Sequence, residues 1–183
     1  MQDSSLWITF KKGDDGAFSQ LYENYADLLY KYGIKFIKDQ EIVKDCIHDL
    51  FIKLYQDREK LPDTNDPLLF LFVSLKNNII DKLRIETKYT SYVDTEFYVD
   101  FYLEQEENLP DLEEQFLEVM SLLSPRQKEG IYLRYQLEMS YDEIAALLKI
   151  SSQSARNLVH RSIEKIRSKM SLTIFLFFFY TSL

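Results

Sequence analysis

Apolar side chains recur at steps of three and four residues in the first half of the chain, which is the spacing of one face of an α-helix. The first such segment contains Phe18, Leu21, Tyr22, Tyr25, Leu28, Leu29, Tyr32 and Phe36. The second starts near Gln40 and contains Ile42, Val43, Cys46, Ile47, Leu50, Phe51, Leu54 and Tyr55. The pattern predicts two amphipathic helices that bury their apolar faces in a core.

The second of these helices has a wide apolar face. Its apolar residues cover more than half of the circumference, whereas one core contact needs an arc of little more than about 100°. An acidic strip on the remaining side consists of Glu41, Asp45 and Asp49. Two interpretations stay open: the helix lies between two neighbours in its own domain, or part of the face binds a partner.

A third helix is predicted after the segment LPDTNDP, with Asp66 as its N-cap and Pro67 as its first residue. Its apolar face consists of Leu68, Phe72, Leu75, Ile79 and Leu83. The opposite arc consists of Lys76, Asn77, Asp81, Arg84 and Lys88. Such an arc can bind a phosphate chain or bases, although a solvated helix surface has the same composition.

Three further helix starts follow in the last third of the chain. Ser124 and Gln127 have the spacing of a capping box, in which cap and third residue exchange hydrogen bonds with the backbone. Ser140 and Glu143 have the same spacing. Ser151 fits the N-cap of the third helix.

The last two of these helices form a helix-turn-helix pattern, because only Ile150 and Ser151 separate them. The outward arc of the second one consists of Gln153, Ser154, Arg156, Asn157, His160 and Arg161. Near a helix start such side chains can reach base edges in the major groove, whereas Arg161, Lys165 and Arg167 suit phosphates. The alternative is a helical hairpin with a basic, solvated face.

Composition supports a helical cytoplasmic protein. The 183 residues include only four glycines and four prolines, which favours long helices over a turn-rich β fold. A single cysteine, Cys46, excludes an internal disulfide framework. The first residues, MQDSSLWITFKKGDD, lack the basic and then apolar order of a signal peptide.

The formal net charge of −8 is unevenly distributed. Residues 1–88 hold 13 basic and 15 acidic side chains, residues 89–123 hold no basic and 10 acidic ones, and residues 124–183 hold nine basic and five acidic ones. This segregation predicts two modules and an acidic linker that does not fold alone. Three interpretations of the linker stay open: it is a solubilising tether, it mimics the charge of a nucleic acid in a basic channel, or it keeps the basic modules off non-specific DNA.

Four stretches, in order, resemble the extracytoplasmic function (ECF) group of the sigma-70 family of RNA polymerase sigma factors. They are GAFSQLYENYADLLYKYGIKF, DQEIVKDCIHDLFIKLYQ, LFVSLKNNIIDKLR and LSPRQKEGIYLRYQLEMSYDEIAALLKISSQSARNLVHRSIEKIR. The resemblance implies an all-α fold of two small helical domains. Sigma region 2 would span residues 1–88 and a helix-turn-helix sigma region 4 residues 113–170, with the acidic linker at 89–112 and a hydrophobic tail at 171–183.

The resemblance also implies roles for the arcs described above. Asp45, Asp49 and Phe51 would bind core RNA polymerase. The minus-10 element of the promoter would be melted and read by Lys76, Asn77, Asp81 and Arg84. The minus-35 element would be read by Gln153, Ser154, Arg156, Asn157, His160 and Arg161. Basic surfaces of the polymerase would supply much of the phosphate attraction, so an acidic sigma factor is physically consistent. An anti-sigma factor is the further implied partner.

Two positions depart from the family pattern. Lys149 stands in the helix-turn-helix where the family often has glycine, so we expect a less regular turn, because left-handed backbone is costly for lysine. Lys76 replaces the usual arginine and loses planar bidentate hydrogen bonding.

Two rival functions come from other classes: an autonomous helix-turn-helix transcription regulator, and a membrane-tethered helical adaptor that uses the tail SLTIFLFFFYTSL. The tail is shorter than the about 20 residues that span a membrane, so membrane contact is expected only indirectly or through shallow insertion. No metal-ligand cluster, phosphate loop or nucleophile motif is present in the sequence. We therefore expect no enzymatic activity, metal or cofactor.

Overall fold

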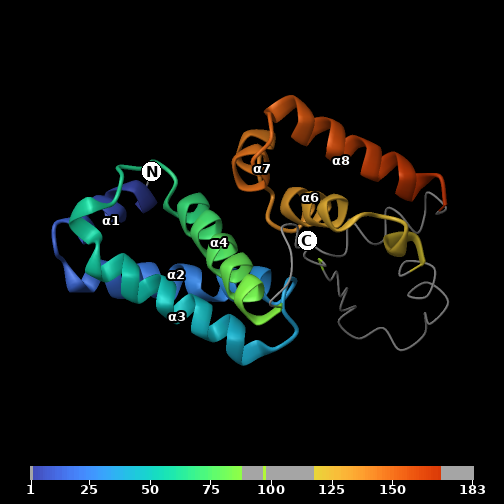
Figure 1. Ribbon diagram of the computed structural model, residues 1–183. Coiled ribbons are helices and arrows are strands. Elements are labelled where there is room, and N and C mark those ends of the chain that lie inside the picture. The colour runs from blue at the N-terminus through green and yellow to red at the C-terminus, as the bar shows by residue number, and fades with distance from the viewer. Residues whose placement is uncertain (1, 88–96, 98–117, 170–183) are drawn as a thin grey trace, which may run out of the picture. The chain divides into compact units, whose positions relative to one another are not determined.

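The computed structural model describes residues 2–87, 97 and 118–169, in which every regular element is a helix (Figure 1). The chain divides into two compact units, Met1–Thr95 and Glu96–Leu183. The predicted all-α class is confirmed. Lys88, the tail at 171–183 and all of the expected linker except Phe97 lie outside the described residues, so the expected domain boundaries stay a prediction.

Unit 1 contains α1 (Gln2–Lys11), α2 (Asp15–Gly33), α3 (Gln40–Gln56), the short 3-10 helix η1 (Arg58–Lys60) and α4 (Pro67–Thr87). Carboxylates cap three of these helices: Asp14 accepts from the Ala17 amide at 2.8 Å, Asp39 from the Glu41 amide at 3.0 Å, and Asp66 from the Leu69 amide at 2.9 Å. The predicted cap at Asp66 and the predicted helix start near Gln40 are confirmed.

Helices α2 and α3 run side by side, and α4 packs against both (Figure 1). Helices α2 and α3 approach closely at Gly33, where a Cβ atom would lie 2.6 Å from Val43 Cγ1. Glycine therefore permits the two helices to approach at this point, and a larger residue would push Val43 out of the core. The core of the unit is formed by fully buried side chains that include Leu21, Leu29, Leu71, Phe72, Leu75 and Ile79.

Helix α1 is an element that the sequence analysis did not predict. Trp7 is fully buried, its indole Nε1–H donates to the Pro62 carbonyl at 3.1 Å, and its ring meets Phe70 edge-on at 5.3 Å. Lys11 forms an ion pair with Asp63. The helix thus holds the segment between η1 and α4 against the rest of the unit.

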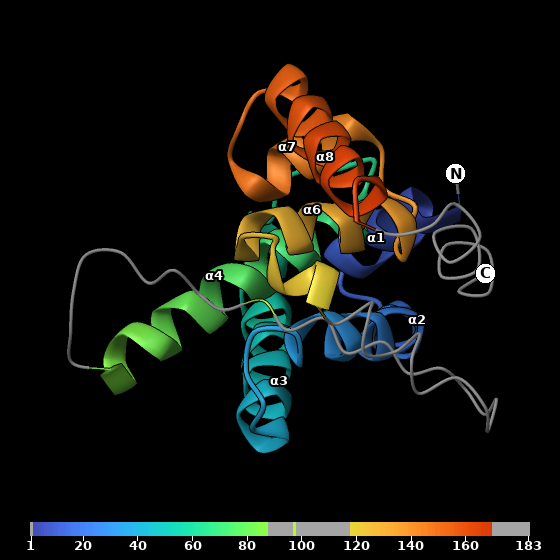
Figure 2. The same ribbon diagram turned by 90° about the vertical axis from the view of Figure 1, so that its right-hand side faces the viewer.

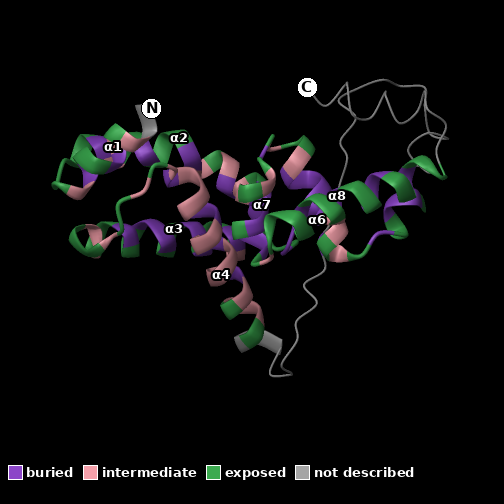
Figure 3. Ribbon diagram, turned by 90° about the horizontal axis from the view of Figure 1, so that it is seen from above, coloured by how far each residue is buried: buried purple, intermediate pink, exposed green. Residues whose placement is uncertain are grey.

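Unit 2 contains α6 (Pro125–Tyr135), α7 (Tyr141–Leu148) and α8 (Ser152–Arg167), and α8 packs against both other helices (Figure 2). Both predicted capping boxes, as well as the predicted N-cap at Ser151, are confirmed. Buried and exposed residues alternate around α8 with helical period (Figure 3). Its buried stripe consists of Ala155, Val159, Ser162, Ile163 and Ile166.

The turn between α7 and α8 is regular, contrary to expectation. Lys149 adopts left-handed backbone, with φ 54° and ψ 51°. The Ile150 N–H donates to the Ala145 carbonyl at 3.0 Å, and the Lys149 N–H to the Ala146 carbonyl at 3.4 Å. This pair of bonds is the Schellman motif that glycine usually completes. Lys149 therefore completes the motif in spite of the steric strain of left-handed backbone.

Phe97, which the sequence analysis placed in the linker, belongs to unit 2. Its side chain is 2% exposed, and its ring meets the Tyr132 ring edge-on with centroids 5.6 Å apart. Burial raises the pKa of the Tyr132 hydroxyl to about 12. An aromatic residue from the acidic segment therefore helps to shield α6 from water.

We expect Lys149→Gly to raise the free energy of unfolding of unit 2 by about 0.5–1 kcal/mol. The substitution removes a left-handed cost of roughly 1–2 kcal/mol but adds about 0.5–1 kcal/mol of chain entropy. Urea unfolding followed by circular dichroism measures the difference. Lys149→Ala is the control, because it removes the charge and keeps the steric cost. Equal stability of the Gly and Ala variants would contradict the explanation.

The raised pKa of Tyr132 predicts alkaline destabilisation. Between pH 10 and pH 12 the unfolded chain loses this proton while the folded chain keeps it, so rising pH lowers the free energy of unfolding, by up to about 2–3 kcal/mol. Urea unfolding at pH 9 and pH 11.5 should show a smaller loss for Tyr132→Phe than for the unmodified protein. Tyr22→Phe, at a side chain 45% exposed, is the control. If the free energy of unfolding fell by the same amount in all three proteins, Tyr132 would not be the source of the alkaline destabilisation.

Candidate nucleic-acid and protein interfaces

The outer arc of α8 presents all six residues that the sequence analysis assigned to it. They are exposed in the structure: Gln153, Ser154, Arg156, Asn157, His160 and Arg161. Two side-chain interactions run along the arc, one from Gln153 Nε2 to Asn157 Oδ1 at 3.0 Å and one between His160 Nδ1 and Glu164 Oε2 at 3.5 Å. Amide, guanidinium and imidazole groups therefore lie together on one solvent-facing side, which is the chemistry that reads base edges.

Some basic side chains of unit 2 form hydrogen bonds with backbone carbonyls of the same unit. Arg126 Nη2 donates to the Leu148 carbonyl at 2.7 Å and so satisfies the C-terminal end of α7. Lys165 Nζ donates to the Leu122 carbonyl. Lys165 was expected to suit phosphates, but in this structure it ties α8 to the segment that precedes α6.

The first turn of α7 contacts the start of α8 through residues that the sequence analysis missed. Tyr141 lies beside the guanidinium group of Arg156, and the Ser152 hydroxyl donates to the Asp142 carboxylate. The signal for these contacts was weak, because Tyr141 and Asp142 fill ordinary first-turn positions of a capped helix. Only the packing of the two helices brings them to the outer arc.

In unit 1 the predicted arc of α4 contains two kinds of environment. Lys76 and Asn77 are half-buried, and the Lys76 ammonium lies 5.7 Å from the centre of the Phe36 ring. Asp81 and Arg84 are exposed and form an ion pair of 3.4 Å. The first pair of residues is held against the unit, whereas the second pair projects into solvent, where an ion pair adds little stability.

The wide apolar face of α3 is covered mainly by neighbours in its own unit. Six residues of α3 are buried, among them Phe51, which is 2% exposed and meets Tyr22 edge-on at 4.8 Å. Phe51 therefore does not fit the surface role expected for it. Asp45 and Asp49 are exposed, as expected for a contact surface.

Two large apolar side chains of α3 are exposed, Tyr55 at the edge of the wide apolar face and Ile52 on the side of the acidic strip. Ile52 is 41% exposed and Tyr55 37% exposed. The Tyr55 hydroxyl donates to Asp15 at 3.0 Å, and its ring meets Phe18 at 5.1 Å, so the exposed ring is fixed in place. The neighbours in unit 1 therefore cover most of the wide face, as the first interpretation expects, and binding of a partner stays a prediction.

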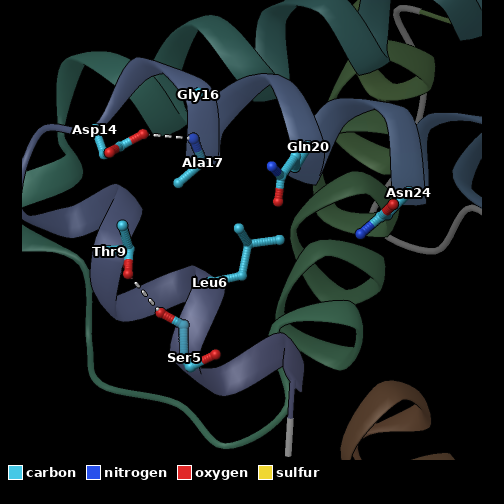
Figure 4. Close-up of a pocket in the computed structure, with 8 residues that line it drawn as sticks. All are labelled: Ser5, Leu6, Thr9, Asp14, Gly16, Ala17, Gln20 and Asn24. Atoms are coloured by element: carbon cyan, nitrogen blue, oxygen red, sulfur yellow. Dashed lines mark hydrogen bonds between the residues drawn. The ribbon is translucent and has the colours of Figure 1, made fainter.

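A groove of about 500 Å³ lies between α1 and α2 (Figure 4). Of its eight lining residues only Asp14 is titratable, and that carboxylate caps α2 through the Ala17 amide. No group of three His, Cys, Asp or Glu side chains within the described ranges is placed to hold a metal ion. None of the described helices is long and apolar enough to cross a membrane.

Comparison with known proteins matches each of the two units to a region of the same protein family. The sequence model of Sigma-70 region 2 matches residues 21–89, and that of Sigma-70, region 4 matches residues 113–166. Together the two matches cover about two thirds of the chain. The candidate surfaces on α3 and α4 fall within the first match, and nearly all of α8 falls within the second.

Two curated proteins are similar over most of their length. The RNA polymerase sigma factor CarQ of Myxococcus xanthus is 23% identical over 159 residues, covering 86% of this chain and 91% of that protein. The ECF RNA polymerase sigma factor SigW of Bacillus subtilis (strain 168) is 22% identical over 173 residues, covering 87% and 92%.

Two solved structures share the fold. One is that of CnrH in complex with the cytosolic domain of CnrY, with a TM-score of 0.63, 19% identity and coverage of 91% of this chain and 95% of that one. The other is the sigma factor RpoE in complex with the anti-sigma factor NepR from Bartonella quintana, with a TM-score of 0.61, 16% identity and coverage of 85% and 97%. The chain belongs to the ECF group of the sigma-70 family and is a sigma factor that directs transcription initiation.

Proposed function

We propose that this sigma factor binds core RNA polymerase through the exposed side of α3, contacts the minus-10 element through α4 and reads the minus-35 element through α8. The observation that carries the proposal is the outer arc of α8. Six residues with base-reading chemistry are exposed along it, opposite a stripe that is buried against α6 and α7. A helix oriented in this way can lie in the major groove without any rearrangement of its unit.

On α8 two amides of the outer arc are paired before DNA binds. The hydrogen bond from Gln153 to Asn157 favours one orientation of both amides, and an oriented amide can form the bidentate contact that distinguishes adenine. The N-terminus of α8 also carries backbone N–H groups that attract phosphate oxygens. Base contacts would therefore come from the first turns of the helix, with phosphate contacts around them.

On α4 the half-buried pair Lys76 and Asn77 is suited to unpaired bases. The ring of Phe36 beneath the Lys76 ammonium limits the motion of that side chain. A fixed cation next to an amide can hold a single strand by its phosphate and by the edge of a base. Asp81 and Arg84 would rearrange from their exposed ion pair when the strand binds.

On α3 the polymerase surface would combine Asp45 and Asp49 with the apolar side chains of Ile52 and Tyr55. An apolar centre with a charged rim is typical of protein–protein interfaces. Phe51 would support this surface from inside the unit. The polymerase would also contribute basic surfaces, which accounts for the net charge of −8 on a protein that acts on DNA.

A sigma factor of this kind would act in the cytoplasm, where the polymerase is. The chain itself would carry out no catalytic step and would need no metal or cofactor. An anti-sigma factor is the proposed regulator. Its support is that RpoE, whose fold this chain shares over 85% of its length, is held in its solved structure by an anti-sigma factor. Contact with a membrane would be indirect, through such a regulator, or through the tail at 171–183.

The first test is a gel shift with promoter fragments from the genome, with and without core RNA polymerase. We expect a specific shift only when polymerase is present. Asn157→Ala should weaken the shift about 5- to 100-fold, the equivalent of one lost base contact. Lys169→Ala, beyond the end of α8, is the control and should change it little. A specific shift by the protein alone would favour an autonomous transcription regulator.

The second test separates the surface of α3 from its interior. Ile52→Ala should weaken binding to core polymerase while changing the free energy of unfolding by less than about 1 kcal/mol. Phe51→Ala should lower the free energy of unfolding by about 3–5 kcal/mol, because it empties a site in the core. Binding of fluorescently labelled protein to polymerase and urea unfolding provide the two measurements. Unchanged polymerase binding by Ile52→Ala would remove Ile52 from the interface.

A further inference from the structure

We infer that Tyr141 is a positioning residue for DNA recognition, which holds the Arg156 guanidinium group in the orientation that reads a base pair. The inference rests on the proposed reading of the minus-35 element by α8. Tyr141 itself need not touch DNA. Its function would be to determine how sharply Arg156 distinguishes one base pair from another.

The Tyr141 ring is in contact with two cationic side chains from different helices. The guanidinium carbon of Arg156, on α8, lies 5.0 Å from the ring centre, and that of Arg134, on α6, lies 5.2 Å from it. Both distances are within the roughly 6 Å over which a cation is attracted to an aromatic ring. Tyr141 is half-buried, so water screens these contacts less than it would on an open surface.

The ring has little freedom to move. Arg134 is anchored on its other side, because Nη1 donates to the Met139 carbonyl at 2.8 Å. The backbone next to Tyr141 is fixed by the capping box, in which the Ser140 amide donates to Glu143 at 2.6 Å and the Glu143 amide donates to Ser140 at 3.3 Å. The backbone of Tyr141 and one of its two cationic neighbours are thus held in place, and the more exposed Arg156 rests against the ring.

A second contact joins the same two helix starts. The Ser152 hydroxyl donates to the carboxylate of Asp142, the residue after Tyr141. Ser152 and Arg156 are four residues apart, which places them on one face of α8. Neighbouring residues of α7 therefore hold two successive turns of α8 on the side next to the proposed DNA surface.

Ordering matters for an arginine because its long side chain loses considerable rotamer entropy when it binds. A guanidinium group that is already oriented loses less, and so gains more from the correct base pair. Without the ring, Arg156 would still attract phosphates by its charge but would discriminate less between bases. We expect a three- to fivefold loss of discrimination, in line with a cation–ring contact near a protein surface.

The test uses holoenzyme reconstituted from the full chain and core polymerase. Its affinity is measured for a promoter and for a set of promoters in which each minus-35 base pair is replaced in turn. Tyr141→Phe keeps the ring and should discriminate as the unmodified protein does. Tyr141→Leu should lose three- to fivefold at the base pair where Arg156→Ala also loses discrimination. The double variant should lose no more than Arg156→Ala alone.

The outcomes separate this inference from the proposed function. If Arg156→Ala relaxes one position but Tyr141→Leu relaxes none, or if the two losses multiply, the positioning role is wrong and the reading by α8 stands. If Arg156→Ala relaxes no position, base reading by Arg156 fails, and the positioning role fails with it.

A second readout does not depend on DNA. The nuclear magnetic resonance order parameter of the Arg156 Nε–H bond should fall in Tyr141→Leu and stay unchanged in Tyr141→Phe. Tyr141→Met replaces Tyr141→Leu in both measurements if the leucine variant does not fold, which circular dichroism shows. An unchanged order parameter in a folded variant without the ring would overturn the inference.

Discussion

Burial of one apolar stripe on α8 decides which of its residues can meet DNA. Ala155 and Ile166 are fully buried and Val159 is 1% exposed, so the rotation of the helix about its axis is fixed by the loss of apolar surface to water. A rotation by one residue position, about 100°, would expose this stripe and bury polar side chains without partners. The buried stripe therefore determines which residues form the outer arc. The residues of the arc do not themselves have to fix the rotation of the helix.

Burial of apolar side chains has a different result for helix α3 in unit 1. Helix α3 has two neighbours, α2 and α4, and its wide apolar face serves both of them. Ile52 and Tyr55 remain exposed, and the contacts of Tyr55 with Phe18 and Asp15 restrict the motion of the Tyr55 ring. An interface that is already ordered loses less entropy when a partner binds. The packing of the unit would therefore prepare the surface proposed to bind polymerase.

The sequence predicted those features whose causes are local. Both capping boxes and the N-caps at Asp66 and Ser151 involve residues within three positions of each other, and the arcs of α4 and α8 follow from helical period alone. Features that depend on distant partners were missed. Helix α1 is held by Trp7 through Pro62, 55 residues away, and Lys165 is diverted to Leu122, 43 residues away. The burial of Phe51 was missed for the same reason, because helical period does not show how many neighbours cover a face.

The left-handed lysine in the helix-turn-helix makes the stability of its turn depend on salt. Lys149 lies directly after the C-terminal end of α7, where the helix dipole favours positive charge. Dissolved salt screens this favourable interaction but leaves the steric cost of the backbone unchanged. A glycine in its place would lack this charge interaction. The stability of this turn is therefore expected to depend more on ionic strength than that of the same turn with glycine.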